Sequence, residues 1–198
     1  MKKVSFKSLK HLLPLLCFTI MCTSACTQND QSTVKDVPSE KLEKISAPKM
    51  DIHMAVISGD LAAVKQHIQA GTDINQKEAM AGSTPIMTAA TFNQPAIAEE
   101  LIKAKADLTI KNNDGSTVLH TAAFFGRIEI VKLLIDAQAD KTIKNNFGAT
   151  PRETVVGDFS EVKPFYEMLI LQLKPMGFTL DLEELQKARP VVAMMLND

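Results

Sequence analysis

The sequence has few of the residues that build crosslinks, cofactor loops or catalytic sites. It holds only three cysteines, Cys17, Cys22 and Cys26, and none follows Cys26. The rest of the chain therefore cannot form an intrachain disulfide, even in an oxidising compartment. Its glycines fall at turns, and no zinc-protease, nucleotide-loop, serine-hydrolase or dinucleotide pattern is present. We therefore expect no enzyme activity, no cofactor and no metal site.

The chain also lacks a large excess of either basic or acidic residues. Lys2, Lys3, Lys7 and Lys10 lie before Cys26, and their removal leaves 18 basic against 23 acidic residues, a net charge of −5. No basic face stands out in what remains. Nucleic acid is therefore not expected as a partner.

The segment that ends at Ala25 has the pattern of a targeting signal. A basic start precedes an apolar run from Leu12 to Met21, followed by the small residues Thr23-Ser24-Ala25. The run is too short to span a membrane, and the pattern is typical of a bacterial secretory signal. We expect residues 1–25 to be a signal peptide.

Cys26 follows this segment directly and precedes the polar Thr27–Ser32. That arrangement resembles a lipoprotein lipobox with Cys26 as the acylated first residue, although Thr23 departs from the usual Leu. Thr27 in place of Asp implies the outer membrane under the usual sorting rule. Residues 26–48 then form a polar tether. The alternative is ordinary cleavage near Ala25, which gives a soluble periplasmic protein.

The main positive feature is a motif that returns at a fixed spacing. The segment Gly82–Ala90 (GSTPIMTAA) returns as Gly115–Ala123 (GSTVLHTAA) and, shortened, as Gly148–Pro151 (GATP). A fixed period in this range indicates stacked repeats, which present an extended surface more often than an active-site cleft. The threonines of this motif occupy expected helix N-cap positions, at Thr84, Thr117 and Thr150.

This pattern resembles the ankyrin repeat, whose core reads roughly G-x-T-P-L-H-x-A-A. The resemblance implies an all-α ankyrin repeat solenoid of about four helix-turn-helix units over residues 49–160, with a C-terminal helical cap over 161–198. Lys105 and Gln138 replace the usual glycine after the second helix. If the backbone is left-handed there, each costs on the order of 1 kcal/mol. The resemblance also makes His53 and His120 structural, since that histidine ties adjacent turns together.

The family's partners contact the turn tips and the inner face of the first helices. Phe92 and Phe125 align on that face, and aromatic side chains are favoured in binding hot spots. The alternative is that these rings only cover the seam between helices. The predicted partner-binding residues are Phe92, Phe124, Phe125, Asn113, Asp114, Asn146 and Phe147.

The sequence therefore predicts a non-catalytic protein-binding module of the bacterial envelope, held at the outer membrane through a lipid on Cys26. Its partner would be an envelope enzyme or a secreted effector. Small secreted ankyrin proteins that resemble it include immunity proteins and accessory factors in oxidative defence, and the residues do not choose between these roles. The alternatives are a structural envelope component without a specific partner and an enzyme.

Overall fold

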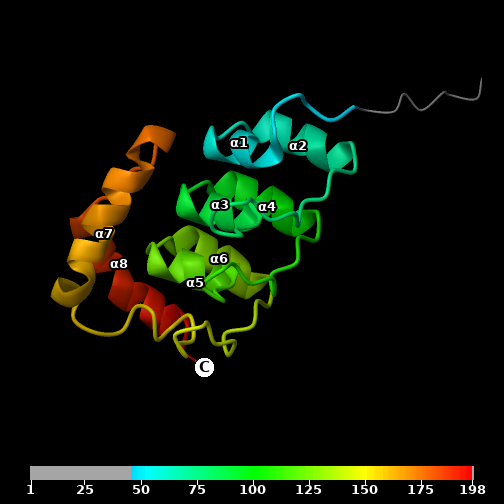
Figure 1. The fold of residues 1–198 in the computed structure, drawn as a ribbon. Coiled ribbons are helices and arrows are strands. Elements are labelled where there is room, and N and C mark those ends of the chain that lie inside the picture. The colour runs from blue at the N-terminus through cyan, green and yellow to red at the C-terminus, as the bar shows by residue number, and fades with distance from the viewer. Residues whose placement is uncertain (1–45, 198) are drawn as a thin grey trace, which may run out of the picture. The chain divides into compact units, whose positions relative to one another are not determined.

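The structure, a computed structural model, describes residues 46–197. The predicted signal peptide and Cys26 lie outside the described residues, as does most of the predicted tether. Within the described part, three pairs of short helices are followed by longer helices at the C-terminus (Figure 1). The helices are α1 (Ile52–Ile57), α2 (Leu61–Gln69), α3 (Pro85–Thr91), α4 (Pro95–Lys103), α5 (Val118–Phe124), α6 (Ile128–Asp136), α7 (Phe159–Leu173), the 3₁₀ helix η1 (Lys174–Met176) and α8 (Leu182–Met195). Between Ser46 and Asn197, none is long and apolar enough to cross a membrane.

The helices begin where the repeat places a capping residue. Asp60 accepts a hydrogen bond from the backbone N–H of Ala63 at 2.9 Å, which satisfies one of the first donors of α2. Thr84 and Thr117 are the N-cap residues of α3 and α5, as predicted. The Thr117 hydroxyl lies 2.9 Å from His120 Nδ1, whereas the buried Thr84 hydroxyl has no partner in the described structure.

The helices end in a recurring left-handed turn. Lys105 and Gln138 have φ values of 66° and 60°, which confirms that these non-glycine residues adopt the strained conformation. After α4, Lys105 N–H donates to Ile102 O and Ala106 N–H donates to Leu101 O, both at 2.9 Å. These two bonds are the Schellman pair that closes a helix on a residue with positive φ.

Within each pair, the first helix contributes small apolar residues to the core and the second helix contributes large ones. Ala89, Ala90, Ala122 and Ala123 are fully buried on α3 and α5, so neighbouring first helices pack closely. The second helices contribute larger side chains to the same core, namely Val64, Ile97, Leu101, Ile130, Val131 and Leu134. Burial of this surface is the main source of stability for a stack that has no crosslinks in its described part.

The fourth unit differs from a complete repeat. Residues 151–155 form turns rather than a helix pair, although Val155 still reaches the core. α8 packs against α5 and α6 and adds Val192 and Leu196 to the core, so it covers the open end of the third pair. Arg152 Nε donates to Asn197 Oδ1 at 2.7 Å and joins the reduced fourth unit to the end of this cap.

Candidate functional site

The two aromatic rings predicted on the inner face are joined by a third. Phe178, which follows η1, lies with its ring centroid 5.8 Å from that of Phe92 and 5.5 Å from that of Phe125, in edge-to-face contacts. Gly177, with φ of 80°, turns the chain at this point. Phe178 is 3% exposed and Phe125 is 8% exposed. The chain's own C-terminal segment therefore covers this part of the predicted surface, and the role of Phe92 and Phe125 in partner binding stays a prediction.

Phe124 is held by α7 in a similar way. Its ring stacks on that of Tyr166 with centroids 4.6 Å apart, and the Tyr166 hydroxyl donates to the Phe124 carbonyl oxygen at 2.7 Å. Arg189 of α8 donates to the same hydroxyl from Nη1 at 3.3 Å. Burial raises the pKa of Tyr166 to about 12 although Arg189 opposes the shift, so this hydroxyl remains a donor at neutral pH.

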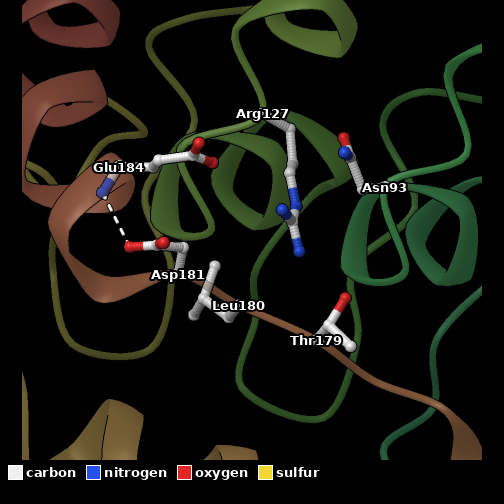
Figure 2. Close-up of a pocket in the computed structure, with 6 residues that line it drawn as sticks. All are labelled: Asn93, Arg127, Thr179, Leu180, Asp181 and Glu184. Carbon is white, nitrogen blue, oxygen red and sulfur yellow. Dashed lines mark hydrogen bonds between the residues drawn. The ribbon is translucent and has the colours of Figure 1, made fainter.

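A shallow pocket of about 450 Å³ lies beside this aromatic cluster, where α8 begins. In Figure 2 the Arg127 side chain extends into it between Asn93 and the start of α8. Arg127 Nη2 donates to the Thr91 carbonyl oxygen at 3.0 Å, and burial lowers the pKa of its guanidinium to about 10. Arg127 therefore joins α3 to the turn after α5, and the lining is mostly polar. The lining residues are Asn93, Arg127, Thr179, Leu180, Asp181 and Glu184.

The turn tips are aligned by a ladder of hydrogen bonds that follows the period of the repeat. Asn113 donates from its backbone N–H to Ala81 O at 2.9 Å and from Nδ2 to Met80 O at 3.1 Å. Asn146 repeats both bonds one unit later, to Asp114 O at 2.9 Å and to Asn113 O at 3.0 Å. The three tips are therefore fixed in register with one another.

This row of tips is open to solvent. Asn113, Asp114, Asn146 and Phe147 are all exposed, and the Phe147 ring is 78% exposed. Met80, which is not among the predicted partner-binding residues, is 81% exposed at the other end of the row. The period itself could have identified it, because Met80 stands one repeat before Asn113 and replaces a polar residue with an apolar one.

Each tip is also braced internally. Asn112 Oδ1 accepts from Asp114 N–H at 3.0 Å and from Ser116 N–H at 2.9 Å, and Asn145 makes the equivalent bonds. The first tip has no such asparagine. There Glu78 accepts from the backbone amides of Met80, Ala81 and Ser83 at 2.6–2.9 Å. Burial raises the pKa of Glu78, but these amides outweigh it, so the pKa is lowered.

The histidines of the repeat motif join neighbouring units, as predicted. His53 Nε2 lies 3.2 Å from Gln76 O, and His120 Nε2 lies 3.0 Å from Ala149 O. Thr117 N–H donates to His120 Nδ1 at 3.2 Å, so this nitrogen is the acceptor and Nε2 carries the proton. Burial lowers the pKa of His120, which favours this neutral form. Across residues 46–197, no three potential metal-ligating side chains are grouped together.

Stacked helix pairs with aligned, exposed tips define a repeat protein. A family model described as ankyrin repeats matches residues 52–145 in three copies. This part of the chain therefore consists of ankyrin repeats, as the recurring motif predicted, and ankyrin repeats are protein-binding modules.

Two curated relatives match part of this chain. One is a palmitoyltransferase named AKR1 from Kluyveromyces lactis, 33% identical in an alignment of 98 residues that covers 46% of this chain and 13% of that protein. The other is protein phosphatase 1 regulatory subunit 27 from Homo sapiens, 42% identical over 64 residues, which are 32% of this chain and 41% of that protein. The chain thus spans less than half the length of either relative, and both relatives are eukaryotic.

Proposed function

We propose that this protein is a non-catalytic binding protein of a bacterial cell envelope that presents its row of repeat tips to a protein partner. The observation that carries the proposal is the tip row itself. Met80 and Phe147 expose apolar side chains at its two ends, and the ladder through Asn113 and Asn146 holds them in fixed register. A rigid surface with apolar anchors loses little conformational entropy on binding, which favours affinity.

The envelope location is supported by the sequence before the repeats. A basic, apolar and small-residue segment ending at Ala25 favours export, and Cys26 favours a lipid anchor at the outer membrane. The partner is then an envelope enzyme or a secreted effector, as in an immunity protein or an accessory factor in oxidative defence. The phosphatase regulatory subunit that shares the repeats supports a role in controlling another protein.

The binding test compares two variants of the full chain in crosslinking experiments in its own cells. Met80→Ser with Phe147→Ser removes both anchors, and Met194→Ser alters a methionine of α8 that is 65% exposed and remote in sequence from the tips. We expect one protein to crosslink to the wild type and to the Met194 variant, and at least tenfold less of it to the double variant. Equal capture by all three chains would refute binding through the tips.

Mass spectrometry of the mature N-terminus tests the location separately. A diacylglyceryl-modified Cys26 at the first position is expected, and an unmodified start would refute the anchor while leaving the tip surface untouched.

A structural role in the envelope is the second candidate, and the position of Phe178 favours it. Because this ring fills the space between Phe92 and Phe125, part of the inner face already serves to hold the C-terminal helices. This role predicts that the same crosslinking experiment captures no stable partner.

A further inference from the structure

α7 has an apolar side that is largely open to solvent, although the Phe165 ring contacts the Phe124 ring edge-to-face with centroids 6.0 Å apart. Of its 15 residues only Tyr166 is buried. Leu171 is 73% exposed, and Phe165, Met168 and the adjacent Met176 are between 38% and 49% exposed. Phe165, Met168 and Leu171 follow one another at three-residue steps, so they form a ridge along one side of the helix. In Figure 1, α7 lies alongside the stacked helix pairs, next to α8. We define the α7 ridge as Phe165, Met168, Leu171 and Met176.

The charges beside the ridge are arranged so that the surface complements itself. Glu167 and Lys174 are separated by two helical turns and therefore lie on the same flank of α7. Glu167 is paired only within its own helix, with Lys163 Nζ at 3.8 Å, where both side chains are about half exposed. Lys174 forms no ion pair with any described residue. When two copies of α7 pack antiparallel, the acid near the middle of each flank can pair with the base at the C-terminal end of the other.

We propose that the α7 ridge is a dimer interface, in which α7 of one molecule packs antiparallel against α7 of a second copy. With the two-fold axis between Ile170 and Leu171, Phe165 lies opposite Met176 of the second copy, and Leu171 lies beside Met168 of the second copy. The same register places Glu167 opposite Lys174 of the second copy. Such an interface is isologous, so every contact occurs twice. A parallel arrangement would instead set lysine against lysine and glutamate against glutamate.

The size of the ridge sets the expected strength. Four partly exposed side chains that each bury on the order of 100 Å² give a total of about 800 Å² over both copies, which is below the ~1,200 Å² of stable specific interfaces and in the range of weak, transient ones. The dimer is therefore weak, with a Kd on the order of 10–500 μM. None of the ridge residues belongs to the tips, so the dimer does not depend on the proposed binding function.

Sedimentation equilibrium of the full chain from about 5 μM to about 500 μM tests the interface. The wild type should shift from monomer toward dimer mass over this range. Leu171→Glu should weaken the association at least tenfold, and Met194→Glu should leave it unchanged. The two positions form a matched pair, because both side chains are strongly exposed and both lie in the last turn of a helix. Monomer mass throughout, or association that Leu171→Glu leaves intact, would overturn the proposal.

Charge exchange tests the register. Because the Glu167–Lys174 pair occurs twice in the dimer, Glu167→Lys and Lys174→Glu should each weaken it by about threefold to tenfold, the scale of two exposed ion pairs. The two changes together should restore it to within about twofold. A double variant no tighter than the single ones would overturn the antiparallel arrangement. Flotation with phosphatidylethanolamine–phosphatidylglycerol vesicles supplies a further arm. If the wild type stays monomeric and Leu171→Glu abolishes vesicle binding, the ridge contacts lipid and the dimer is refuted.

Discussion

Phe178 is expected to be one of the anchors that hold the C-terminal segment against the repeats. Its replacement by alanine removes a ring that is 3% exposed and in edge-to-face contact with Phe92 and Phe125. Loss of the buried surface costs about 2 kcal/mol, and each aromatic contact adds about 0.5–1 kcal/mol. We therefore expect Phe178→Ala to lower the free energy of unfolding by about 3 kcal/mol. If the segment detaches before the repeats unfold, the measured loss is limited to the free energy that docks it.

Urea unfolding followed by circular dichroism gives the first number, and hydrogen exchange of the α7 amides shows whether the segment detaches. Phe147→Ala is the matched control, because it is the same substitution at a ring that is 78% exposed, and it should change stability by less than about 0.5 kcal/mol. A loss below about 1 kcal/mol for Phe178→Ala, with α7 exchange unchanged, would refute the idea that this ring anchors the segment. The variant would also uncover Phe92 and Phe125, which makes it the direct way to test their predicted role in binding.

Two further predictions concern the repeats themselves. Burial lowers the pKa of His120 below the ordinary 6.5, so the unfolded chain takes up a proton at a higher pH than the folded chain. The stability that neutral His120 contributes is therefore present above pH 6.5 and is lost as pH falls below it. His120→Gln should flatten this part of the pH dependence in urea titrations, and an unchanged slope would contradict the assignment. Lys105→Gly and Gln138→Gly should each raise the free energy of unfolding by about 0.5 kcal/mol, since relief of a positive φ exceeds the added chain entropy of glycine, and a lower urea midpoint in both variants would show that these turns carry no strain.

The repeats were predictable because the residues that cap and end the helices lie within each unit, and the same pattern occurs three times in the chain. Thr117 and the left-handed Gln138 each lie at a fixed distance from the equivalent residue of another copy, so the regular spacing was enough to place caps, turns and helices. The same regularity misled at Thr84, where the cap position is occupied but the hydroxyl finds no partner. Met87 stands at the position where His120 supplies that partner one repeat later, and its thioether cannot replace the imidazole.

The C-terminal segment was harder to predict because its contacts do not repeat. Its apolar residues indicated that it packs against the repeats. Nothing in the sequence shows which residues Phe178 contacts, because Phe92 and Phe125 lie far earlier in the chain, in two different repeats. The fourth unit posed the same problem. Its GATP motif predicts a helix start, but residues 151–155 form turns, and α8 rather than a fourth helix pair packs against the third pair.

The ladder at the tips also determines how a chain of this kind can change in length. A Cβ atom at Gly82 or Gly115 would collide with the side chain of the asparagine that the following unit contributes, whereas a Cβ at Gly148 would meet nothing within 4 Å. The tip at Gly148 therefore has space for the asparagine that one more unit would contribute. Duplication of residues 115–147 as a block would keep every bond of the ladder, while insertion of any other length would break it. Gain or loss of surface in evolution, or in the laboratory, should therefore proceed by whole repeats and never by fractions of one.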